Sequence, residues 1–123
     1  MNSVSSNAVR QAITTVLAPQ TGNVILIDTT MSMSGTLIKS GKVCSLQLRI
    51  WKEGEITITN GQVLCTIPEG FRPLSHAWVE IQNFDGLGSH QLIAIDSYGS
   101  LYCVLQQTYD RLDFYISVTW IIA

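Results

Sequence analysis

The stretch LDFYISVTWII, residues 112–122, decides the fold because it alternates apolar and polar side chains throughout its length. One face holds Leu112, Phe114, Ile116, Val118, Trp120 and Ile122, and the other holds Asp113, Tyr115, Ser117 and Thr119. A period of two is typical of a β-strand with one face in a core. Ile121 breaks the alternation, so we expect both faces of that end to be covered, with a subunit interface as the cover.

The sequence before this strand repeats the same pattern between Gly, Asn, Asp and Pro turns. Strands are expected at residues 23–28, 42–51, 55–59, 62–67, 76–82, 91–96 and 101–105, with a weak strand at 36–39. Asn60 and Gly61 indicate a tight hairpin because both residues tolerate a positive φ. The pattern predicts an all-β fold, an antiparallel β-sandwich or barrel of jelly-roll or Greek-key type. This head domain would span residues 23–123.

Residues 1–19 have a different period. Val9, Ile13 and Val16 follow one another at four-then-three spacing, which predicts a short amphipathic α-helix that ends at Pro19. A helix of about a dozen residues is not stable alone in water. We therefore expect a helical stalk segment whose apolar seam packs on the β domain or on copies of itself.

The composition indicates a hidden surface and excludes several classes of partner. Charged residues make up 13% of the chain, against about 25% in ordinary soluble domains, and hydrophobic residues make up 46%. This deficit favours an oligomer; the alternative is a small neutral domain coated with Ser, Thr, Asn and Gln. The net charge is −2 and the basic residues are scattered, so no nucleic-acid partner is expected.

The sequence does not predict membrane insertion or secretion. No apolar run approaches the roughly 18 residues that a membrane-spanning helix needs. No Lys or Arg lies early in the N-terminal segment, and Arg10 interrupts its apolar stretch. We therefore expect no signal peptide.

No residue spacing predicts a metal site, a cofactor or a catalytic group. His76 and His90, the two histidines, are not at metal-ligand spacing, and Cys44, Cys65 and Cys103 form an odd set. The simplest interpretation is free thiols in a reducing cytosol. Cys44 falls on an apolar strand face and is expected to behave as a small hydrophobic residue.

The sequence contains more residues suited to binding a ligand than to catalysis. We therefore expect a protein that is not an enzyme. The aromatic residues outside the expected core faces are Trp51, Trp78, Tyr98, Tyr102, Tyr109 and Tyr115. A ring with a polar edge suits recognition of carbohydrate or protein. The alternative is that these rings line trimer contacts or a second core, an interpretation that we prefer for Trp51 and Trp78.

Two segments resemble a known family, and two later features agree with it. The segment SVSSNAV, residues 3–9, resembles the lead-in to a short helix in tail-fibre and receptor-binding proteins of phages and prophages. The segment IPEGFRP, residues 67–73, resembles the proline-glycine corner of their C-terminal β heads. The hairpin IDSYGSL, residues 95–101, and the apolar closing strand agree with such heads.

The resemblance implies a homotrimer in a phage tail. Val9, Ile13 and Val16 would face the threefold axis, and the β heads would pack around it. It also implies adhesion to a host-surface polysaccharide or teichoic acid without catalysis, with baseplate or tail proteins as further partners. The protein would be made in the bacterial cytoplasm and act on the virion.

Two other functions stay open at this point. The chain could be a structural fibre-tip or trimerisation module that binds nothing itself. It could also be a hydrolase acting on surface polysaccharide, which would require a carboxylate pair in a groove.

The expected ligand site follows from the direction of the strands. Binding loops cluster at one end of a β domain. If the strands alternate in direction, residues 29–41, 60–61, 83–89 and 107–111 share one end, and residues 52–54, 68–74 and 97–100 share the other. A real strand at 36–39 would exchange the two ends.

From this arrangement we place the ligand-binding residues in the first set of loops. They are Phe84, Asp85, His90, Tyr109, Asp110 and Arg111. Replacing Tyr109 or Arg111 by alanine is expected to weaken binding and to leave the fold intact.

Overall fold

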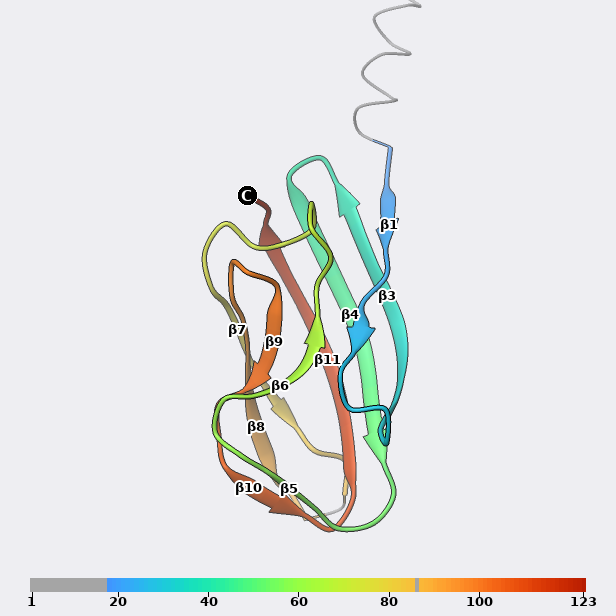
Figure 1. The fold of residues 1–123 in the computed structure, drawn as a ribbon, viewed down its shortest axis with the longest axis vertical. Helices are drawn as coiled ribbons and strands as arrows, with labels where there is room; N and C mark the ends of the chain where they lie inside the picture. The colour runs from blue at the N-terminus through green and yellow to red at the C-terminus, as the bar shows by residue number, and fades with distance from the viewer. Residues whose placement is uncertain (1–17, 86) are drawn as a thin grey trace, which may run out of the picture.

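The computed structural model describes residues 18–85 and 87–123, which form an all-β domain of antiparallel strands (Figure 1). The strands are β1 (Gln20–Gly22), β2 (Ile25–Leu26), β3 (Ser32–Ser40), β4 (Val43–Lys52), β5 (Ile56–Ile58), β6 (Gln62–Thr66), β7 (Ala77–Gln82), β8 (His90–Ile95), β9 (Ser100–Cys103), β10 (Gln107–Tyr109) and β11 (Leu112–Ile121). Within the described residues no helix is found that could cross a membrane. The expected stalk helix, with Val9, Ile13 and Val16, lies outside the described residues.

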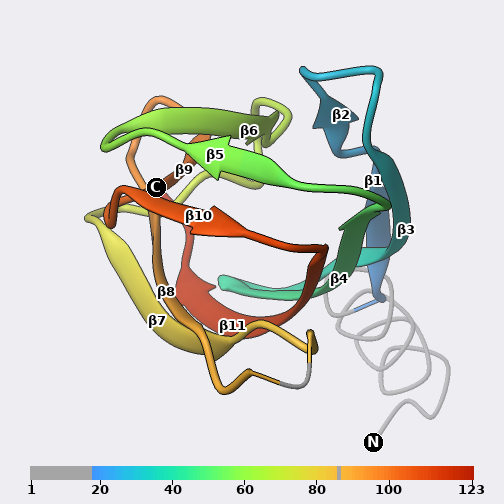
Figure 2. The same cartoon turned by 90° about the horizontal axis from the view of Figure 1, so that it is seen from below.

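Two main sheets enclose the core. One has the strand order β1-β3-β4-β11, and the other has the order β2-β6-β9-β8-β7. They meet where β1 continues into β2, and again where Asn83, just after β7, bridges Phe114 of β11. The two-stranded sheet of β5 and β10 lies across one end of the enclosed space (Figure 2).

The pairing of the later strands is nested. Strand β4 pairs with β11, β5 with β10, β6 with β9, and β7 with β8, each time antiparallel. The chain therefore folds back on itself around the β7–β8 connection. This pairing places residues that are far apart in the sequence side by side. Folds with many such long-range contacts generally fold slowly.

The alternation predicted for β4 and β11 is confirmed. In β4 the buried residues are Cys44, Leu46, Leu48 and Ile50; in β11 they include Leu112, Phe114, Ile116 and Trp120. Val118 and Ile122 pack against this core while partly exposed. Ile121 points outward and is 60% exposed in the single chain, so the cover expected for this end does not come from the chain's own described residues.

The three cysteines are free and buried. Burial raises the pKa of Cys44 to about 11 and that of Cys65 and Cys103 to about 12. The thiols therefore stay protonated at neutral pH. Cys44 acts as the small core residue that its place on an apolar strand face predicted.

The corner IPEGFRP is hydrogen-bonded to two strands of the first sheet, the edge strand β11 and the interior strand β3. Trp120 Nε1 of β11 donates a hydrogen bond of 2.7 Å to the Phe71 carbonyl. Lys39 Nζ of β3 donates to the Gly70 carbonyl at 2.9 Å and lies 4.6 Å from the centre of the Phe71 ring. The motif that carries the family resemblance therefore has a structural role here.

The weak strand expected at 36–39 is a full strand, β3, paired with β4 along its length. Ser40 pairs with Val43, so the β3–β4 hairpin lies at the near end, where the described chain begins (Figure 1). Ser32 pairs with Trp51 at the far end. Because β3 is rich in Ser, Thr and Gly, its sequence predicted only a short, weak strand.

The predicted grouping of loops changes as a result. Gly41 belongs to the near end, so placing all of residues 29–41 at the tip is wrong. The turn 52–54 belongs to the far end, because Lys52 pairs with Leu112. Residues 83–84 and 110–111 also lie at the far end, so two of the loops expected at the tip do meet there.

Gly35 lies close to the backbone of β4, and this gives a prediction. At φ +150°, a Cβ added to Gly35 would lie 2.1 Å from the Gln47 carbonyl oxygen and 2.8 Å from Leu48 Cα. Because both atoms are backbone of β4, Gly35→Ala should lower the free energy of unfolding by more than about 2 kcal/mol in denaturant titration.

Gly54→Ala is the matched control, since Gly54 also has a positive φ but an added Cβ there meets nothing within 4 Å. We expect this variant to lose about 1 kcal/mol. Equal losses at the two glycines would show that the close approach to β4 does not matter.

Candidate binding site

The outer face of β3, β4 and β11 carries an open groove of about 610 Å³. It is lined by Ser34, Gly35, Gln47, Leu48, Arg49, Tyr115, Ile116 and Ser117. The pairing register explains this set, because Arg49 lies between Ser34 and Tyr115, and Gln47 is paired with Ser117. The alternation that sends apolar side chains into the core leaves these polar and aromatic ones outside.

Arg49 is the centre of the groove. Its Nε lies 3.0 Å from Asp113 Oδ1 and its Nη2 lies 3.2 Å from Asp113 Oδ2, a two-pronged ion pair. The hydrogen bonds that Arg49 donates to the Asp113 carboxylate raise the pKa of Arg49 above its ordinary value. The guanidinium carbon also lies 4.5 Å from the centre of the Trp51 ring and 5.3 Å from that of Tyr115. The side chain is therefore fixed by charge and by stacking together.

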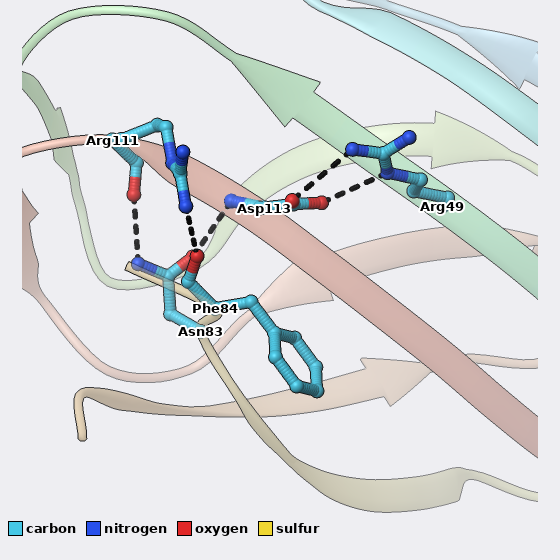
Figure 3. A network of polar contacts seen from close by, with 5 residues as sticks. All are labelled: Arg49, Asn83, Phe84, Arg111 and Asp113. Carbon is cyan, nitrogen blue, oxygen red and sulfur yellow. Dashed lines mark hydrogen bonds and ion pairs between the residues drawn. The ribbon is translucent and has the colours of Figure 1, made fainter. Parts of the chain in front are cut away.

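A clamp at Asn83 holds the far-end loops against the start of β11 (Figure 3). Asn83 is buried; its Nδ2 donates to the Arg111 carbonyl at 2.7 Å, and its Oδ1 accepts from the Asp113 amide at 2.7 Å. The Phe84 amide donates to the Asp113 carbonyl at 3.1 Å, and Arg111 Nη2 donates to the Phe84 carbonyl. The same strand residue, Asp113, thus connects the clamp with the groove.

Phe84 extends the groove toward the far end. Its ring meets the Tyr115 ring edge-on, with the centres 5.0 Å apart. Both side chains are about half exposed, at 51% and 49%. We name the set Trp51, Arg49, Tyr115 and Phe84 the stacked row. It presents aromatic surface and a fixed guanidinium on one exposed face.

The structure brings only some of the predicted site residues to this surface. Phe84 belongs to the stacked row, and Arg111 supports it through the Phe84 carbonyl. Asp110 is exposed in the turn between β10 and β11. His90 is exposed at the start of β8, where its Nδ1 lies 3.5 Å from Glu80 Oε1.

Asp85 shapes its own loop. Its Oδ1 accepts a hydrogen bond from the Leu87 amide at 2.9 Å, and its Oδ2 accepts one from Ser89 Oγ at 3.1 Å. The bond from the Leu87 amide contributes most to lowering the pKa of this carboxyl. This is the ordinary work of an aspartate in a turn.

The prediction for Tyr109 is corrected. Its side chain is 1% exposed, and its hydroxyl donates to the His90 carbonyl at 2.9 Å and accepts from Gln91 Nε2 at 3.0 Å. Burial raises the pKa of Tyr109 to about 12. Because β10 lies across the end of the core, the ring turns inward against Phe114. Tyr109→Ala would therefore damage the fold and could not report on a ligand.

The sequence alone does not indicate the centre of the groove. Trp51 and Tyr115 were recognised as rings on polar strand faces, but their placement around Arg49 depends on the register between β4 and β11. Alternation along residues 42–51 places Arg49 and Gln47 on the same polar face of that strand. Pairing that face with the polar face of β11 would have indicated the groove.

The comparisons with known proteins leave the family open. No protein-family model matches the chain, and no curated protein is significantly similar to it. Within residues 18–85 and 87–123, no cluster of three or more His, Cys, Asp or Glu side chains could hold a metal ion. The resemblance to phage receptor-binding proteins therefore stays a prediction.

The clamp predicts a large effect of one buried amide. Asn83→Ala removes two hydrogen bonds and leaves the Asp113 amide and the Arg111 carbonyl without this partner. We expect the free energy of unfolding to fall by about 2–3 kcal/mol in denaturant titration. Asn60→Ala, in the exposed β5–β6 turn, should change it by less than about 0.5 kcal/mol. A loss at Asn83 no larger than at Asn60 would contradict the clamp.

Proposed function

We propose that this chain is the head of a phage or prophage receptor-binding protein that binds host cell-surface saccharide without catalysis. The observation that carries the proposal is the stacked row, in which the exposed rings of Phe84 and Tyr115 and the partly buried ring of Trp51 surround a fixed guanidinium beside an open groove. The protein would act on the virion as a homotrimer, with tail or baseplate proteins as partners.

The chemistry of the groove suits a sugar. A pyranose ring has an apolar C–H face that packs on an aromatic ring, and hydroxyl groups that need hydrogen bonds at its rim. Tyr115 offers the ring, while Ser34, Gln47 and Ser117 offer neutral donors and acceptors beside it. All four side chains project from paired strands, which position a site more firmly than loops do.

The nested pairing also supports a finer description of the fold. We infer a β-sandwich of the jelly-roll or Greek-key type. The support is the nested pairing, in which β4 pairs with β11, β5 with β10, β6 with β9 and β7 with β8. The strand order β6-β9-β8-β7 is that of a Greek key: three consecutive strands with the preceding strand placed beside the third. Such folds carry many functions, so this inference supports architecture alone.

The trimer is supported by an apolar patch at the near end. Val43, Leu74 and Ile121 are each about half exposed or more, at 49%, 64% and 60%. The Leu74 amide donates to the Ile121 carbonyl, and Ile121 pairs with Val43, so the three residues are neighbours. This patch equally favours the second candidate, a structural fibre-tip module that assembles and binds nothing.

Alanine substitutions in the stacked row separate the two candidates. Tyr115→Ala and Trp51→Ala should each weaken binding to whole bacterial cells by about tenfold or more, because each removes a ring from the site. Binding would be measured with labelled protein over a panel of bacterial strains, and thermal unfolding would confirm that each variant folds.

Trp78→Ala is the matched control, since Trp78 is also about half exposed but lies on β7, in the other sheet. It should bind like the unmodified protein. Saturable binding that is lost only in the Trp78 variant would move the site to the other sheet. Absence of saturable binding to any strain would favour the structural module.

A further inference from the structure

We infer that the groove selects a neutral sugar and discriminates against phosphate-bearing polymers such as teichoic acid. This inference rests on the proposed function and narrows its ligand. It follows from the balance of charge in the groove, from the hydrogen-bonding groups that are left for a ligand, and from the partners of the other nearby cations.

The groove has one charged lining residue, and its charge is compensated. Arg49 is that residue, and both of its bonds to Asp113 are about 3 Å long. The Asp113 side chain is 12% exposed, so the pair is shielded from solvent on the carboxylate side. A phosphate approaching Arg49 would also approach the Asp113 carboxylate, and the two negative charges repel each other.

Arg49 also uses part of its hydrogen-bonding capacity on Asp113, which occupies the Nε–Nη2 edge of the guanidinium. Phosphate is best bound by a guanidinium that offers two parallel N–H groups. Here Nε and Nη2 already point at Asp113, and the rings of Trp51 and Tyr115 lie against the guanidinium. The Arg49 guanidinium is therefore held in a fixed orientation where it lines the groove.

The remaining cations near the far end have partners of their own. Lys52 Nζ donates to Thr30 Oγ1 at 2.9 Å, beside Asp28. Arg111 Nη2 donates to the Phe84 carbonyl. Neither side chain lines the groove. Among the described residues, the groove lining and the far end therefore offer an anionic polymer no cluster of free cations.

The neutral lining favours hydroxyl groups. Ser34 and Ser117 carry hydroxyls and Gln47 carries an amide, so each can both donate and accept. Tyr115 provides a half-exposed ring for the apolar face of the sugar. A neutral pyranose satisfies both kinds of group and leaves no uncompensated charge at the groove.

The test compares two classes of probe on the full chain. Tryptophan fluorescence and calorimetry would follow titration with methyl glycosides of glucose, galactose, rhamnose and N-acetylglucosamine, and with glycerol phosphate and its polymer. We expect at least one neutral glycoside to bind at least tenfold more tightly than either phosphate probe. Raising NaCl from about 0.05 to 0.5 M should change that affinity by less than twofold, because no net charge is neutralised.

Asp113→Asn provides a second readout. It keeps the shape and the backbone amide that bonds Asn83, but it leaves Arg49 without a counter-charge. The preference for neutral over phosphate probes should fall at least tenfold in this variant. Lys42→Gln, which removes an exposed cation in the β3–β4 turn at the near end, away from the groove lining, should leave the preference unchanged.

The outcomes separate the two proposals. Tighter binding of the phosphate polymer, weakened by salt, would overturn the neutral-sugar inference and keep the receptor-binding function. Binding of no probe and of no bacterial cells would overturn both. A lower solution mass for Tyr115→Ala than for the unmodified chain would show that a second copy occupies the groove, which also overturns the inference.

Discussion

The antiparallel ladder between β4 and β11 is the constraint on which the rest of the structure depends. Its ten residue pairs run from Val43 opposite Ile121 to Lys52 opposite Leu112. This register sends the apolar side chains of both strands into the core and their polar side chains to the outer face. It also joins the end of the chain to its first half, so the strands between them must fold back as nested pairs.

The same ladder makes the outer face a defined surface. Arg49 and Tyr115 are direct cross-strand partners, and Trp51 is the partner of Asp113. Cross-strand neighbours are close enough for stacking and ion pairing. The ion pair between Arg49 and Asp113 therefore connects adjacent positions of the register. Through the Asp113 amide and Asn83, the far-end loops are tied to the same strand.

The strongly alternating parts of this fold could be predicted from sequence, and the polar parts could not. The core faces of β4 and β11 follow directly from their period of two. Strand β3 could not be predicted in full, because its Ser, Thr and Gly residues show little apolar alternation. It nevertheless pairs with β4 along its whole length. The near-end and far-end loops were partly exchanged as a consequence.

The candidate site shows the same division. Loop positions such as Phe84 and Arg111 could be predicted, because turn residues mark them and the strand directions bring them together. The burial of Tyr109 could not, because β10 crosses the end of the core and no local pattern encodes that crossing. The groove itself depends on register across two strands that are about sixty residues apart in the chain. Only long-range pairing reveals it.

The central claim is that the outer face of β3, β4 and β11 is the binding surface. A ¹H–¹⁵N NMR titration with soluble cell-wall polysaccharide from a strain that binds the protein tests it most directly. The account predicts saturable shifts at the amides of Gln47, Arg49, Tyr115 and Ser117, with little change in the second sheet. Shifts confined to residues around Trp78 or to the corner 67–73, with the groove amides unchanged, would contradict it.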